Sequence, residues 1–89
     1  MALKLVTKIS TASGQGWEAH KRGGVTTLVL NAPTTPIALP NEFRPNTNIQ
    51  MAITGIGGQS GRAIINANSG VVTPFIDGNF YGTVTYLNP

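Results

Sequence analysis

The chain of 89 residues contains no cysteine and a single histidine, His20. Disulfide bridges, and metal sites built from cysteine and histidine ligands of one chain, are therefore excluded as supports for the fold. Acids are also few: Glu18, Glu42 and Asp77 lie far apart in the sequence. This set predicts neither a Ser-His-Asp triad nor a glycosidase carboxylate pair. We expect a protein that is not an enzyme and needs no cofactor.

Charge is scarce as well, since only 10% of the residues are charged. The net charge of +3 comes from six Lys and Arg residues scattered between Lys4 and Arg62, without the dense basic stripe that phosphate binding requires. No apolar run is long enough to span a membrane, and residues 1–10 lack the continuous apolar core of a signal peptide. We expect a soluble, unsecreted protein whose partners include neither nucleic acid nor a membrane.

The small size makes the core marginal, because a chain of this length buries only roughly two-thirds of the surface that its unfolded form exposes. With disulfides and metals excluded, self-association is the remaining way to support such a domain. Apolar residues on both faces of one short segment, Val25, Leu28, Val29 and Leu30, fit a strand that is covered on both sides.

The sequence contains short strand-like runs separated by turn residues and no helix-length periodic segment. Gly23-Gly24 predicts a hairpin between strands 17–22 and 25–31, and residues 37–39 form a brief edge strand after Pro33 and Pro36. Phe43, between Pro40 and Pro45, is expected to be a buried plug at a corner of the chain. Further strands are predicted at 48–54, 62–67, 71–76 and 80–87. About seven short strands predict an all-β fold, a small antiparallel β-barrel or sandwich.

The N-terminal region is expected to be a segment separate from the β-domain. Residues 1–10 alternate between apolar and other residues and resemble the end of something longer, and residues 10–16 are interpreted as a flexible polar connector. We therefore expect a neck or linker segment over residues 1–10 and a head domain over residues 11–89.

Aromatic side chains are the best candidates for ligand binding, because sugar rings stack their C–H faces on aromatic rings while their hydroxyls bind amides, carboxylates and Arg. Residues 55–61 are rich in glycine, and because glycine has no side chain, a ligand would be able to approach the backbone of this segment closely. The candidate platforms are Trp17, Phe75, Phe80 and Tyr81. The tentative saccharide-binding set is Trp17, Gln59, Arg62, Phe75, Asp77, Asn79 and Tyr81.

Each candidate also has a structural interpretation. Phe75, like Tyr86, lies in an apolar run and fits core packing, Trp17 fits a lid over one end of the barrel, and Asp77 and Asn79 fit a turn. A trimer would allow three copies of His20 to meet, although a solvated strand residue is the simpler interpretation.

Several short segments resemble the head domains of receptor-binding proteins from the baseplates of tailed phages that infect lactococci and related bacteria. The resemblance covers nearly the whole chain. It is carried by Pro40-Asn41-Glu42-Phe43 with Pro45, Gly57-Gly58, Ser69-Gly70 before a strand, and the terminal Gly82-Thr83-Val84-Thr85-Tyr86, while residues 3–8 are similar to the join between neck and head.

The resemblance implies a homotrimeric knob at the tail tip of the virion, which binds saccharide or glycerol-phosphate groups of the host cell-wall polysaccharide and assembles with other baseplate proteins, without a cofactor. The family's pocket combines an aromatic residue with His, Asp and Arg. Phe75 matches the aromatic residue, whereas Ala63, Ile65 and Tyr81 stand where the other three would be. Arg62, Asp77 and Asn79 are suggested in place of the family's three polar residues, because they carry polar groups at strand ends or on loops.

Two other functions remain open. One is a structural module, a baseplate or neck adaptor or a decoration protein, in which Trp17 and Tyr81 pack against another phage protein. The other is a hydrolase, which would release reducing ends from the polysaccharide. Titration with host wall polysaccharide separates the saccharide-binding knob from the adaptor, because the adaptor would bind none.

Overall fold

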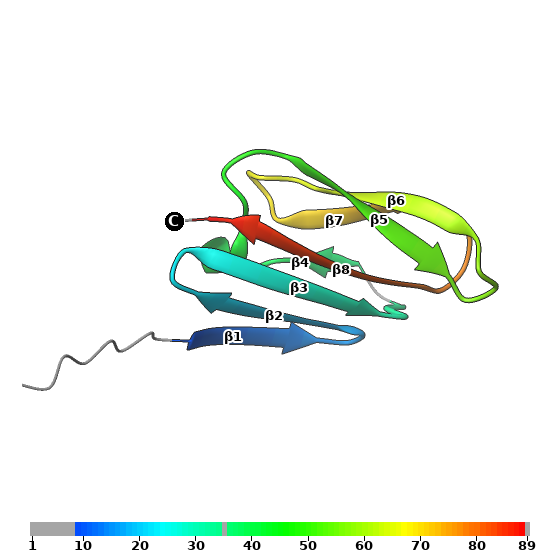
Figure 1. Ribbon diagram of the computed structural model, residues 1–89, viewed down its shortest axis with the longest axis horizontal. Helices are drawn as coiled ribbons and strands as arrows, with labels where there is room; N and C mark the ends of the chain where they lie inside the picture. Colours follow the sequence, from blue (N-terminus) through cyan, green and yellow to red (C-terminus); the bar gives the residue numbers. More distant parts are fainter. Residues whose placement is uncertain (1–8, 35, 89) are drawn as a thin grey trace, which may run out of the picture.

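Eight β-strands and one short 3₁₀-helix make up the computed structural model, which describes residues 9–34 and 36–88 (Figure 1). The elements in chain order are β1 (Ile9–Gly14), β2 (Trp17–Arg22), β3 (Val25–Asn31), β4 (Ile37–Ala38), the 3₁₀-helix η1 (Asn41–Phe43), β5 (Ile49–Gly55), β6 (Ser60–Ile65), β7 (Val71–Phe75) and β8 (Phe80–Leu87). The prediction of an all-β fold is confirmed, with eight strands instead of about seven.

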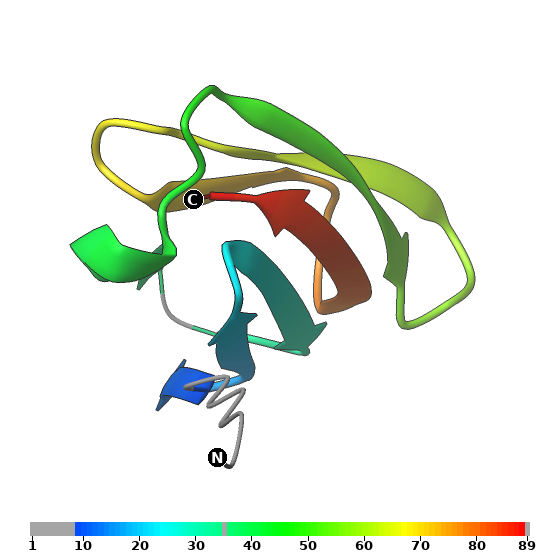
Figure 2. The same cartoon turned by 60° about the vertical axis from the view of Figure 1, so that its left-hand side comes forward.

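All paired strands are antiparallel and lie in one sheet of order β1-β2-β3-β8-β5-β6-β7-β4, which curls into a nearly closed barrel. The sheet has two halves, β1-β2-β3-β8 and β5-β6-β7-β4. In the sheet they are joined by two residue pairs between β5 and β8, Thr54 with Tyr81 and Gly55 with Phe80. Figure 2 shows β5 and β6 diverging from β8 beyond this junction. A curled sheet of this kind buries one face of every strand without requiring a second layer.

The core follows from the period-two pattern of the strands. Alternate residues of each strand point inward, and Leu28 and Leu30 of β3 pack with Met51 and Ile53 of β5 and with Ile65 of β6. The prediction that Ile49, Met51 and Ile53 share the buried face of one strand is confirmed, since Ile49 also packs against the core.

The Gly23-Gly24 hairpin is confirmed: β2 and β3 pair from Trp17–Leu30 to Arg22–Val25, and both glycines have positive φ, 59° and 80°. Such angles match the primed turns that glycine permits. Residues 37 and 38 form β4, which pairs only with β7 and is an edge of the sheet as predicted.

Strand direction places the connections at two opposite ends of the barrel. We call the loop end the one with the β1–β2 turn, the β3–β4 connection, and the β5–β6 and β7–β8 loops. The closed end holds the Gly23-Gly24 turn, η1, the turn at 66–70 and residue Asn88 (Figure 1).

At the closed end the predicted corner is present. Phe43 is buried, with 3% of its surface exposed, and its carbonyl accepts a hydrogen bond from the Tyr86 hydroxyl. The interpretation of Tyr86 as a core residue is therefore confirmed.

The connector predicted at 10–16 is wrong. Residues 9–14 form β1, which pairs with β2 over six residue pairs, and only Gln15-Gly16 is a turn, with φ of 77° at Gly16. Ala12 packs against the core, so a strand of small residues can add to a sheet edge without large apolar groups. The expected boundary between residues 10 and 11 consequently falls inside β1, while residues 1–8 lie outside the described residues.

Candidate functional site

All seven residues of the tentative saccharide-binding set lie at the loop end, on β2, β6, β7 and β8 or on the two long loops. Backbone hydrogen bonds tie these connections together. The Asn31 amide donates to the Gly16 carbonyl (2.7 Å), and the Ile56 amide donates to the Asn79 carbonyl (3.1 Å). The loop end is therefore one continuous surface, but its candidates separate into two groups.

The first group centres on Arg62 and Phe75, which are direct cross-strand partners on the outer face of β6 and β7. The guanidinium carbon lies 5.1 Å from the centroid of the Phe75 ring, which is a cation–π geometry. The Phe75 side chain is exposed (49%), so the interpretation of Phe75 as a core residue is wrong. The reason is parity: Val72 is the residue of β7 that the core buries, and Phe75 is three positions away, on the other face.

The polar members of this group lie on the two loops beside the Arg62–Phe75 pair. The Gln59 side chain turns back on its own loop, where its Oε1 accepts a hydrogen bond from the Gly57 amide (3.1 Å). Asn79 contacts the neighbouring loop through its backbone carbonyl. Asp77 is exposed and precedes Gly78, whose φ is 82°. The Gln59 contact is local to its own loop, and the positions of Asp77 and Asn79 fit the turn interpretation of these two residues.

The second group surrounds Trp17 and forms an open hollow of about 330 Å³, which we call the Trp17 depression. Most of its lining is polar. It is lined by Ser13, Gly14, Gly16, Trp17, Glu18, Val29 and Asn31. The partly buried indole packs against the core and lies over Gly14, where any Cβ atom would overlap the ring nitrogen. The lid interpretation of Trp17 is therefore supported by its packing against the core, and Trp17 is also one of the residues that border the hollow.

Strand register brings Tyr81 next to this depression. Asn31 on β3 is the direct partner of Tyr81 on β8, and both side chains are exposed on the outer face. One strand further out, Glu18 opposes both Ser13 and Val29. A hydroxyl, a carboxylate, an amide and the Tyr81 ring thus lie on the outer face of four adjacent strands, while Trp17 has the parity of buried Ala19 and packs toward the core.

His20 lies beside the depression, with its Nε2 3.7 Å from Oε2 of Glu18, and both side chains are about half exposed. It is a solvated strand residue, as the simpler interpretation predicted.

Ser13, Glu18 and Asn31 were not among the predicted site residues. Glu18 follows Trp17 in the sequence, whereas Ser13 and Asn31 belong to the site because β1 and β3 pair with the two edges of β2. The available signal was Gln15-Gly16 between two runs that alternate, which is a hairpin pattern.

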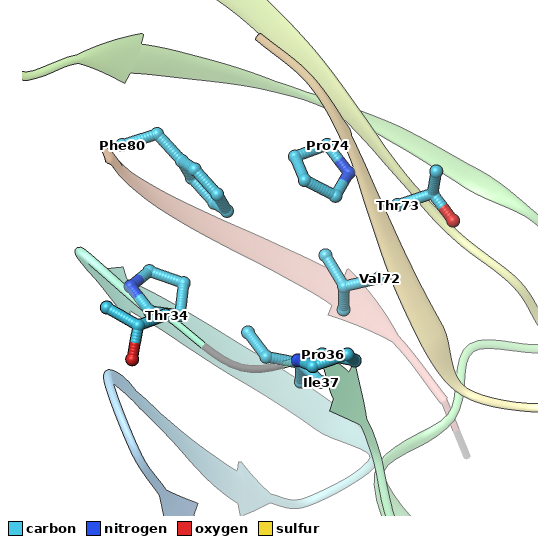
Figure 3. A pocket seen from close by; sticks show the side chains of 8 residues that line it. Thr34, Pro36, Ile37, Val72, Thr73, Pro74 and Phe80 are labelled. Atoms are coloured by element: carbon cyan, nitrogen blue, oxygen red, sulfur yellow. The ribbon is translucent and has the colours of Figure 1, made fainter. Parts of the chain in front are cut away.

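A second hollow of about 320 Å³, which we call the apolar cavity, lies between the β3–β4 connection and strands β7 and β8 (Figure 3). It is lined by Pro33, Thr34, Pro36, Ile37, Val72, Thr73, Pro74 and Phe80. Phe80 was expected as an exposed platform, but only 5% of its surface is exposed, because it begins β8 with an inward side chain.

Among residues 9–34 and 36–88, no cluster of three or more His, Cys, Asp or Glu side chains is placed to hold a metal ion. The same residues contain no helix that is long and apolar enough to cross a membrane. The chain matches no protein-family model and no curated protein.

Proposed function

We propose that this chain is a non-catalytic, saccharide-binding head domain of a phage receptor-binding protein, and that the Trp17 depression together with Tyr81 forms its binding surface. One observation carries the proposal: Trp17, Glu18 and Asn31 line a single open hollow, beside the exposed ring of Tyr81. Aromatic faces accept the C–H groups of a sugar ring, while carboxylate and amide groups bind its hydroxyls.

Charge and shape support a neutral, hydroxyl-rich ligand. The depression contains one carboxylate, Glu18, and no Lys or Arg in its lining, so it offers acceptors to hydroxyl groups and repels anions. An open hollow binds each sugar unit weakly. Several copies of the site on one particle engage a repeating polymer together, which raises the overall affinity without new contacts.

The phage setting rests on the resemblance and on the barrel architecture. In this proposal the head is a homotrimer at the tail tip, attached to other baseplate proteins, and its receptor is the host cell-wall polysaccharide. The positions that match the family's His and Asp are Ala63 and Ile65, both fully buried in the core. The family's polar pocket therefore has no counterpart on β6, which supports a different location for the site.

Calorimetric titration with host wall polysaccharide tests the proposal, with the oligomeric mass measured on the same sample by light scattering. We expect saturable heat from a trimer of the 9.3 kDa chain. Glu18→Ala removes the carboxylate from the depression and should weaken binding by about tenfold, the equivalent of one charged hydrogen bond.

The matched control is Glu42→Ala, which removes another exposed carboxylate but at the closed end. It should leave the affinity unchanged. Absence of heat with the unmodified protein contradicts saccharide binding, and equal weakening by the two variants contradicts the location of the site.

The structural adaptor is the second candidate, and exposed apolar side chains at the loop end favour it. Ile56 is 68% exposed on the β5–β6 loop, and Phe75 is 49% exposed at the end of β7. A partner protein that docks at the loop end would cover such side chains. The adaptor predicts no heat with polysaccharide and a stable complex with another phage protein.

A further inference from the structure

The apolar cavity has no role in the proposed saccharide site. It is separated from the Trp17 depression by the contact between Gly16 and Pro33, where a Cβ on Gly16 would overlap the proline ring. The depression and the cavity therefore lie on the two sides of one wall, and what binds in one does not enter the other.

Three prolines and two hydrogen bonds restrict the described residues that border the cavity. Pro33, Pro36 and Pro74 each have a constrained φ, and Figure 3 shows the Pro74 ring and the Phe80 ring on facing sides of the space. The β3–β4 connection is held by hydrogen bonds from the Thr34 amide to Oε1 of Gln15 (2.7 Å) and from the Ala32 amide to the Phe80 carbonyl (2.8 Å).

The base of the cavity is built from the core itself. Ile37 and Val72 are direct partners of the β4–β7 pair, and they are only 3% and 4% exposed. Almost none of their surface is accessible, so the accessible surface of the hollow comes mainly from its exposed lining residues Thr34, Pro36, Thr73 and Pro74.

Size and chemistry define what fits. A volume of about 320 Å³ lies at the lower end of ligand pockets, which span roughly 300–1,000 Å³. It holds about ten non-hydrogen atoms at roughly 30 Å³ each. Among the described residues, no ionisable side chain lines it and Thr34 and Thr73 are its only polar residues; Figure 3 shows the Thr73 side chain on the opposite side of β7 from Val72 and Pro74. A charged group would lose its hydration there without a counter-charge.

From this geometry we infer that the apolar cavity binds a small, neutral, ring-sized molecule that has an apolar face and at most one or two hydroxyl or carbonyl groups. The mouth of a β-barrel is a common place for such a site. The inference goes beyond the saccharide proposal and does not depend on it, because the cavity shares none of its lining residues with the Trp17 depression.

The test is a titration of the full, ¹⁵N-labelled chain with cyclohexanol, followed by the backbone amide signals. The matched probe is cyclohexanecarboxylate, which has the same ring but a negative charge. We expect saturable shifts for Val72, Thr73 and Phe80 with cyclohexanol, and binding of the carboxylate weaker by at least about tenfold because its charge loses hydration.

Two variants locate the binding. Val72→Phe fills the base of the cavity, and Thr34→Trp covers its rim from an exposed position in case the first variant does not fold. Either one should abolish the cyclohexanol shifts. The control Thr11→Trp adds the same bulk to the exposed face of β1 and should leave them unchanged.

The inference is overturned if cyclohexanol causes no saturable shifts, if the shifts persist in the variants that block the cavity, or if the carboxylate binds as well as the alcohol.

Discussion

The two ends of the barrel differ in how their polar groups are used. At the closed end they bond to one another inside the protein. Thr26, which is fully buried, donates from its hydroxyl to Oδ1 of Asn88 (2.6 Å), and Nδ2 of Asn88 donates to the Glu42 carbonyl (3.0 Å). At the loop end, Glu18, Asn31 and Tyr81 are exposed and face solvent.

Arg44 and Arg62 show the same contrast between two side chains of one type. Arg44 at the closed end is part-buried and donates to the carbonyls of Leu39 (3.0 Å) and Asn68 (2.8 Å). Arg62 at the loop end is exposed, and its guanidinium lies over the face of the Phe75 ring. Buried groups that satisfy one another stabilise the fold, whereas exposed groups are free to bind a ligand. Under the proposed function, stability and recognition are therefore assigned to opposite ends.

The largest expected effect comes from the buried plug. Phe43→Ala empties its site and should lower the free energy of unfolding by about 3–5 kcal/mol, the usual cost of this truncation in a core. Phe75→Ala, the same truncation on an exposed ring at the loop end, should cost only about 0.5–1 kcal/mol through the lost contact with Arg62. Urea denaturation at a fixed protein concentration measures both. Equal costs would remove the distinction between the two ends.

A smaller effect should appear at high pH. Burial raises the pKa of Tyr86 from 10.0 to about 12, and the hydrogen bond from its hydroxyl to the Phe43 carbonyl favours the same neutral form. Since the unfolded chain loses this proton near pH 10 and the folded chain near pH 12, the contribution is complete below pH 10 and is lost as the pH rises toward 12.

Tyr86→Phe provides the control for this pH dependence. It should be less stable than the unmodified protein at neutral pH, because the buried Phe43 carbonyl loses its donor. The stability difference between the two proteins should shrink as the pH rises from 10 to 12. A difference that stays constant over this range contradicts the role assigned to the Tyr86 hydroxyl.

Much of the fold follows from local patterns in the sequence. Gly23-Gly24 predicts its hairpin because both positions need positive φ, and the run from Phe80 to Leu87 alternates clearly enough to fix β8. Phe43 is identified by the prolines on either side. In each case the information lies within a few neighbouring residues.

The exceptions depend on contacts between distant residues. Apart from Ile9, β1 is built from Ser, Thr, Ala and Gly, so its strand conformation comes from pairing with β2 and not from its own pattern. Phe75 was assigned to the core because its run is apolar, but which face is buried depends on the register with β6.

The site residues also fall into those that the sequence identifies and those that depend on strand pairing. Residue type identified Trp17 and Tyr81 as aromatic platforms, and Glu18 is adjacent to Trp17 in the sequence. Asn31 lies at the depression through the pairing of β2 with β3, and Tyr81 is brought beside it only by the β3–β8 register. Sequence reasoning supplied the chemistry of the site, and the sheet supplied its location.

The most direct test of this account is a map of amide chemical-shift changes when fragments of host wall polysaccharide are added to the full chain. The account predicts changes in residues 13–18, 29–31 and 81, with the closed end unaffected. Changes confined to η1, the turn at 66–70 and Asn88, or no changes at all at saturating polysaccharide, would contradict it.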